Sequence, residues 1–167
     1  METINIKGTE YIPVNERIKE FWKRYPDGNI ITELVTNENG VCVIKANIYV
    51  NGDLKTTGYA YEKESSSFIN KTSYIENCET SAIGRALGIL GIGIDASVAS
   101  AEEVENAMEN QKKIDATHAS ALEKAIMNKN LPSDVVVSTL AKFGYKAISE
   151  ITVGDYMNVV NAFKEAK

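Results

Sequence analysis

The sequence predicts an α+β fold in which one helix, three antiparallel strands and a long helix follow one another, with a small three-helix module behind them. Three observations predict this order. Apolar residues recur at helical spacing before residue 26, three strand-like segments with short turns come next, and a long helical pattern begins near Asn70. A run of strands between helices is typical of an α+β domain whose sheet has helices on one face.

The first helix is predicted over residues 14–25. Its apolar side chains recur every three or four positions, at Val14, Ile18, Phe21, Trp22 and Tyr25. The Pro26-Asp27-Gly28 turn then ends the helix, because proline and glycine interrupt helical backbone. Three strands are predicted after this turn, IITELV at 30–35, VCVIKANIYV at 41–50 and LKTTGYAYEK at 54–63.

Two registers are open for the second hairpin. A three-residue loop pairs Val50 with Leu54, whereas the Asn-Gly dipeptide favours a two-residue turn that pairs Val50 with Asp53. We expect the first register, because it brings the apolar faces of both strands together and keeps Lys55 and Lys63 out of the core.

In that register the outer face of the sheet gathers basic and aromatic side chains, namely Lys45, Tyr49, Lys55, Tyr59, Tyr61 and Lys63. Single-stranded nucleic acid is bound by such a combination, since ammonium groups contact phosphates and rings stack on bases. The alternative is that the tyrosines are ordinary half-buried residues of a sheet.

Residues 79–93, ETSAIGRALGILGIG, pose the question whether a glycine-rich loop binds phosphate here. A dinucleotide-binding fingerprint needs its glycines directly after a strand, at the start of a helix. Here Gly84 and Gly88 lie inside the long helix predicted from Asn70 to about Leu90, so the order is reversed. We therefore expect the glycines to serve packing.

Each of these two glycines costs a helix about 1 kcal/mol relative to alanine. Close approach of another backbone, from a strand or a neighbouring subunit, would offset that cost, and we expect a homo-oligomer. Glu79 falls among the apolar residues of the same helix, and a buried carboxylate needs a partner from the sheet or across a subunit boundary. The predicted apolar stripe consists of Ile75, Cys78, Ala82, Ala86 and Ile89.

Arg85 lies on a flank of this helix together with Tyr74, Ser81 and Gly88. Its small neighbours leave the guanidinium accessible, so this flank could hold a phosphate backbone, with Lys71 adding positive charge. The alternative is a solvated salt bridge at the rim of the helix.

A composition shift around residues 111–117 divides the chain into a core of residues 1–113 and a helical module of residues 114–167. The SAEE motif at 100–103 is a capping box that starts a helix running to about Lys113. We expect the module to fold independently and to be dispensable for nucleic-acid contact. Its three helices are predicted at 117–129, 133–143 and 154–166.

The 167 residues carry a net charge of −5, which argues against a strongly basic DNA binder but permits a local basic face. Cys42 and Cys78 are expected to be reduced core thiols of a cytosolic protein. His118 has no second histidine or cysteine nearby, and no nucleophile triad, phosphate loop or spaced carboxylate pair is evident. We therefore expect a binding protein that is not an enzyme, with no metal, cofactor or membrane segment.

Two stretches resemble the phage single-strand annealing proteins of the Sak and ERF kind, which are similar to the eukaryotic annealing protein Rad-fifty-two. They are ETSAIGRALGILG and the preceding TGYAYEKESSSFINKTSYIENC. In that group a Gly-Tyr strand, here Gly58-Tyr59, leads through a serine-containing turn into a long helix that ends in a basic stretch, here Arg85-Ala86-Leu87. RIKEFWKRYPDGNI resembles the group's first helix, so the resemblance covers about residues 10–95. One departure is that Gly84 stands where the group often has a second basic residue.

The resemblance implies a β-β-β-α core that assembles into rings or filaments and anneals complementary single-stranded DNA without ATP. It implies a role in phage-type homologous recombination and DNA repair, in the cytoplasm of a bacterial host. The helical module resembles tails of phage recombination proteins, which implies contact with a single-stranded-DNA-binding protein or an exonuclease of host or phage. The alternative function is an acidic protein-interaction factor, such as a phage inhibitor or adaptor of host proteins, that does not bind DNA.

Overall fold

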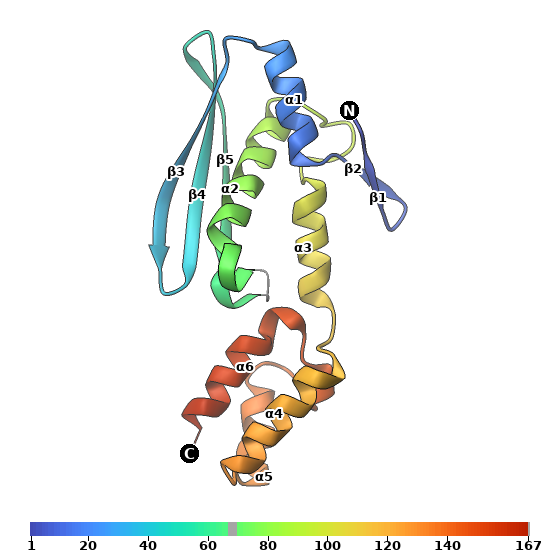
Figure 1. Ribbon diagram of the computed structural model, residues 1–167, viewed down its shortest axis with the longest axis vertical. Coiled ribbons are helices and arrows are strands. Elements are labelled where there is room, and N and C mark those ends of the chain that lie inside the picture. Colours follow the sequence, from blue (N-terminus) through green and yellow to red (C-terminus); the bar gives the residue numbers. More distant parts are fainter. Residues whose placement is uncertain (67–69, 167) are drawn as a thin grey trace. The chain divides into compact units, whose positions relative to one another are not determined.

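The computed structural model describes residues 1–66 and 70–166, and it confirms the predicted α+β class (Figure 1). The described residues form two compact units, one of residues 1–64 and 70–107 and the other of residues 65–66 and 108–166. The division falls inside helix α3 (Ala101–Gln111), before the predicted position after residue 113. The serine-containing turn predicted before the long helix falls partly on residues 67–69, outside the described residues.

The first unit begins with a hairpin that the sequence pattern did not indicate. Strands β1 (Ile4–Ile6) and β2 (Thr9–Tyr11) pair in antiparallel fashion across the two residues Lys7 and Gly8. Both of these residues have positive φ, 50° and 86°, which is the conformation of a type I′ hairpin turn. Helix α1 (Val14–Arg24) follows as predicted.

The central sheet has the antiparallel order β3-β4-β5, with β3 at Asn29–Glu38, β4 at Val41–Val50 and β5 at Asp53–Lys63. The two Asn-Gly turns, at residues 39–40 and 51–52, also have positive φ throughout. Asparagine and glycine tolerate this region, which explains why both hairpins close tightly.

The preferred register of the second hairpin was wrong at its turn. Val50 pairs with Asp53, so the Asn-Gly turn has two residues, and Leu54 pairs with Tyr49. A register shift follows, and the next pair joins Ile48 to Thr56. This β-bulge restores the expected pairing along the rest of the hairpin, so the tight turn and the predicted faces coexist.

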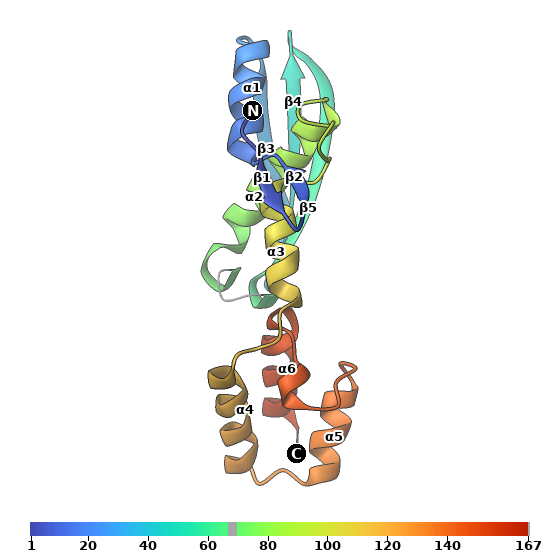
Figure 2. The same ribbon diagram turned by 90° about the vertical axis from the view of Figure 1, so that its right-hand side faces the viewer.

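The core of the first unit lies between the sheet and helix α2 (Asn70–Ile89), which the sequence predicted almost to the residue. Figure 1 shows α2 along one face of the sheet, with α1 on the other side of its upper end, and Figure 2 shows the same elements turned by 90°. Of the predicted apolar stripe, Cys78, Ala82 and Ala86 are buried, whereas Ile75 near the start of α2 and Ile89 at its end are exposed. The buried residues are Phe21, Cys42, Ile44, Ala46, Ile48, Cys78, Ala82, Ala86, Leu87 and Ile92.

Both cysteines are free and buried in this core, as predicted. Burial raises the pKa of the Cys78 thiol to about 12, and the neighbouring Cys42 adds to the shift. A thiol with so high a pKa holds almost no thiolate near neutral pH, so it is a packing residue.

The second unit is built on three helices, α4 (Ala116–Asn128), α5 (Ser133–Ala141) and α6 (Val153–Glu165). Their apolar faces form a separate core that includes Leu122, Leu140, Val159 and Phe163, with Ile151 fully buried among them. Among the described residues, no helix is both long and apolar enough to cross a bilayer.

Gly58 sets how closely α2 approaches β5. A Cβ atom at this position would lie 2.5 Å from the Ala86 nitrogen and 2.6 Å from the Ala82 carbonyl oxygen. Both atoms belong to the backbone of α2, which cannot move away without separating the helix from the sheet.

We expect Gly58→Ala to destabilise the first unit by about 1–3 kcal/mol or more, because the added methyl group overpacks the core. Urea unfolding followed by fluorescence of Trp22, the single tryptophan, measures this. Lys55→Ala, at an exposed position of the same strand, is the control, because its ion pair with Asp53 contributes only about 0–1 kcal/mol. Equal losses in both variants would contradict the prediction.

Candidate nucleic-acid interface

The outer face of the sheet, opposite α2, carries the predicted aromatic residues. Tyr59 and Tyr61 on β5 are 54% and 66% exposed. Across the ladder Tyr59 pairs with Lys45 and Tyr61 pairs with Val43, so these side chains share one face. Lys63 pairs with Val41 two residues further along the same face. The structure therefore places four of the predicted residues together, and the two tyrosines protrude from the sheet.

The positive charges on this face are balanced by carboxylates. Lys45 Nζ lies 3.2 Å from Oε2 of Glu33 on β3, and this hydrogen bond is the main cause of a raised pKa of Lys45. Lys55, at the bulge, pairs with Asp53 at 3.1 Å. Because two of its lysines already have carboxylate partners, the face has less positive potential than its lysines alone would give.

Three other predicted residues lie along α2, apart from this face. The Tyr74 hydroxyl donates to Oδ1 of Asn37 at 2.8 Å, and Lys71 is exposed in the first turn of the helix. Glu79 was expected to be buried, but it is exposed and accepts a hydrogen bond from Thr32 Oγ1 at 2.6 Å. Glu79 lies on the side of α2 that faces the edge strand β3, where α2 no longer covers the sheet.

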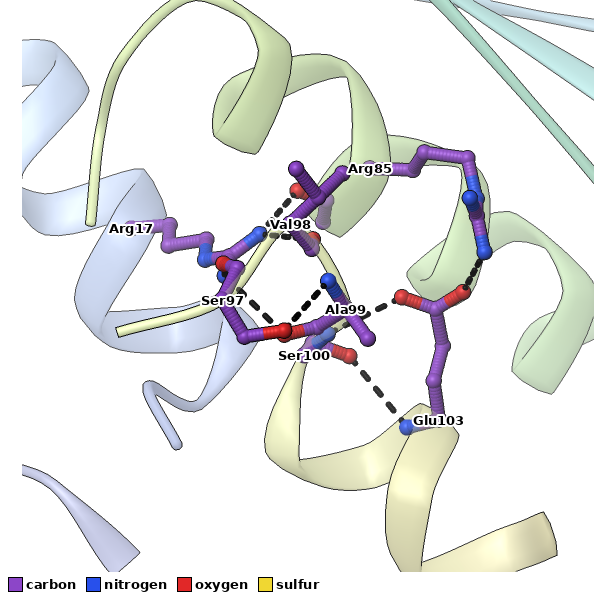
Figure 3. Close-up of polar contacts among 8 residues, drawn as sticks. Arg17, Arg85, Ser97, Val98, Ala99, Ser100 and Glu103 are labelled. Carbon is purple, nitrogen blue, oxygen red and sulfur yellow. Dashed lines mark hydrogen bonds and ion pairs between the residues drawn. The ribbon is translucent and has the colours of Figure 1, made fainter. Parts of the chain in front are cut away.

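Arg85 lies on α2, on the inner side of the sheet, and so does not share the face that holds the tyrosines. Its Nη2 donates to Oε1 of Glu103 on α3 at 2.6 Å (Figure 3). The Arg85 side chain remains 43% exposed. The structure thus shows the salt bridge that was the alternative for Arg85, with part of the guanidinium still accessible.

Sequence reasoning missed the most constrained polar residue of the unit, Arg17. This side chain of α1 is fully buried, and its guanidinium donates to four backbone carbonyls (Figure 3). Nη1 contacts the Gly84 and Val98 oxygens at 2.7 and 2.8 Å, and Nη2 contacts the Ser97 and Ala99 oxygens at 2.5 and 3.1 Å. We call these contacts the Arg17 clasp. It joins α1, α2 and the segment that leads into α3.

The helix glycines make room for this clasp. A Cβ on Gly88 would lie 2.5 Å from Arg17 Nη1, and one on Gly84 would lie 2.6 Å from Cγ2 of Val14. Their close packing is therefore accounted for within one chain. The homo-oligomer stays a prediction, and the glycines no longer provide a reason for it.

We expect Arg17→Met to destabilise the first unit by at least about 3 kcal/mol, because several buried carbonyls each lose a hydrogen bond worth roughly 1–3 kcal/mol. Arg24→Met is the matched control, since Arg24 lies on the same helix but forms an exposed pair with Glu20. That pair contributes only about 0–1 kcal/mol. Urea midpoints from Trp22 fluorescence compare the two variants, and similar midpoints would show that the clasp does not determine stability.

Residues 18–90 match a family model described as Slr1353 N-terminal dsRNA-binding domain-like. The matched segment runs from α1 through the sheet to the end of α2, and it contains all the predicted nucleic-acid-binding residues. The similarity therefore concerns the first unit, at the level of a nucleic-acid-binding class of domain. No curated protein and no solved structure matches the chain.

Proposed function

We propose that the first unit binds single-stranded nucleic acid on the outer face of its sheet. The exposure of Tyr59 and Tyr61 beside Lys45 is the observation that carries this proposal. Exposed rings on an open sheet face stack on unpaired bases of any sequence, and each stacked base contributes about 1–3 kcal/mol. The family similarity of residues 18–90 supports the broader class, nucleic-acid binding.

Stacking supplies more of the proposed affinity than phosphate contacts do. The chain has a net charge of −5, and both Lys45 and Lys55 are already paired with carboxylates. A phosphate must compete with these pairs, whereas a base meets an open aromatic ring. We therefore expect a weak dependence of affinity on salt compared with basic DNA-binding proteins.

Double-stranded RNA is the second candidate ligand, because the matched family is described as dsRNA-binding domain-like. A duplex keeps its bases stacked inside, and proteins recognise double-stranded RNA through phosphates, 2′-hydroxyls and helix shape. Protruding tyrosines favour the single strand over the duplex, so removing a ring should weaken binding of a single strand and leave binding of a duplex unchanged.

The finer function that we propose is annealing of complementary single-stranded DNA without ATP, in recombination of the phage type. The resemblance of the Gly58-Tyr59 strand and the Arg85-Ala86-Leu87 helix end to phage annealing proteins supports it. Bases that lie on the protein surface and are not stacked on one another are also available to pair with a complementary strand.

We expect Tyr61→Ala to weaken binding of a labelled single-stranded oligonucleotide by about 1–3 kcal/mol and to leave the salt dependence nearly unchanged, since a ring carries no charge. Fluorescence anisotropy at several salt concentrations measures both quantities. Tyr11→Ala, in the separate β1–β2 hairpin, is the matched control and should bind normally. If the same titration favours a double-stranded RNA and Tyr61→Ala has no effect, the duplex is the ligand.

For annealing, we expect the protein to accelerate pairing of two complementary labelled strands without ATP, as measured by energy transfer between the labels. Tyr59→Ala combined with Tyr61→Ala should remove the acceleration, because unstacked bases are no longer displayed. Pairing at the spontaneous rate, with both strands saturated by protein, would reject annealing and leave a single-strand-binding protein.

A further inference from the structure

We infer that Glu103 masks Arg85 and that nucleic-acid phosphate competes with this carboxylate for the guanidinium. The Arg85 guanidinium then has two positions, one against Glu103 and one against a bound phosphate. The unbound protein holds it against Glu103, which lowers the affinity of the protein for nucleic acid. This inference rests on the proposed nucleic-acid-binding function and identifies how that function is restrained. It concerns a residue outside the segment matched by the family model.

The masking carboxylate is held in place independently of Arg85. Glu103 Oε2 accepts a hydrogen bond from the Ser100 backbone N–H at 2.9 Å, and the Glu103 N–H donates to Ser100 Oγ at 3.3 Å. These two bonds are the capping box that the SAEE motif predicted. The Glu103 side chain is only 15% exposed. When Arg85 leaves, the carboxylate therefore stays bound to the start of α3.

The Arg17 clasp fixes the capping residue in turn. Ser100 is fully buried and follows directly on the three carbonyls, of residues 97–99, that Arg17 binds. Glu103 cannot follow a moving Arg85 without disturbing this buried segment. The flexible partner of the ion pair is consequently Arg85, whose side chain is 43% exposed.

The ion pair is weak enough for a phosphate to compete with it. Partly exposed pairs contribute little net free energy, since solvent screens them and both side chains lose rotamer freedom. Phosphate accepts two hydrogen bonds from a guanidinium at once, whereas Glu103 takes one from Nη2.

Glu103→Gln distinguishes the capping hydrogen bond, which it keeps, from the negative charge, which it removes. The glutamine carbonyl oxygen still accepts from the Ser100 N–H, as capping boxes with glutamine do. The charge that attracts Arg85 is lost. We expect the affinity for a labelled single-stranded oligo-dT to rise about two- to fivefold, the range set by an exposed ion pair. The slope of log affinity against log salt should steepen by about 0.7, the value for one added contact to a single strand.

Two variants control for other causes. Glu105→Gln removes the same charge from an exposed position on the same helix and should change affinity less. In the Arg85→Ala background, Glu103→Gln should no longer raise affinity, which a double-mutant cycle tests directly. Glu103→Asp keeps the charge at the start of α3 but shortens the side chain, so it should give a smaller rise in affinity. This variant replaces Glu103→Gln in the comparison if Glu103→Gln shifts the urea midpoint.

Equal rises for Glu103→Gln and Glu105→Gln would overturn the inference, because net charge alone would then explain them. An unchanged or reduced affinity of Glu103→Gln would overturn it as well, since Glu103 would then be neutral or would position Arg85 for binding. If, in either case, the unmodified protein binds oligo-dT and Tyr61→Ala weakens this binding, the proposed function stands and only the masking by Glu103 is rejected. If no variant binds oligo-dT, the proposed function itself fails.

Discussion

The Arg17 clasp is the interaction on which the arrangement of the first unit depends. A guanidinium buried among four carbonyl oxygens is stabilised by backbone dipoles, and no carboxylate of the described residues forms an ion pair with it. Burial lowers its pKa, while the charges of Glu103 and Glu102 act in the opposite direction. Arginine suits this position because its planar fork presents several donors at fixed angles. The clasp decides where α1 meets α2 and where α3 begins.

Other features of the sequence follow from this buried cation. Gly84 and Gly88 leave space on α2 for Val14 and for the guanidinium, which offsets their cost to the helix. Ser100 begins α3 immediately after the carbonyls that Arg17 binds, so Glu103 faces the flank of α2 that carries Arg85. A single buried side chain therefore positions the ion pair that restrains the proposed phosphate contact.

Local patterns predicted the helices, the three strands of the central sheet and the SAEE cap because these depend on residue spacing along the chain, but they did not predict the β1–β2 hairpin. The sequence did not reveal Arg17, since an arginine within an amphipathic helix usually indicates the solvent side. It also did not reveal the Arg85–Glu103 pair, which depends on how two helices pack. The register of the β4–β5 hairpin was predicted only in part. A tight Asn-Gly turn and an apolar inner face each demanded a different pairing, and the bulge near Lys55 satisfies both.

The side chains of β5 point alternately to the two faces of the sheet, and this explains how an acidic protein could bind nucleic acid in stages. Tyr59 and Tyr61 point outward, whereas Glu62 faces inward with Cys42, near the charge of Glu103. On the outer face Lys45 and Lys55 are paired with carboxylates, and on the inner side Arg85 is paired with Glu103. A single strand would meet the stacking face first, where electrostatic repulsion is weaker. Because β5 is an edge strand, the nucleic-acid backbone could then pass around its open edge toward Arg85, and only this second contact requires Arg85 to leave Glu103.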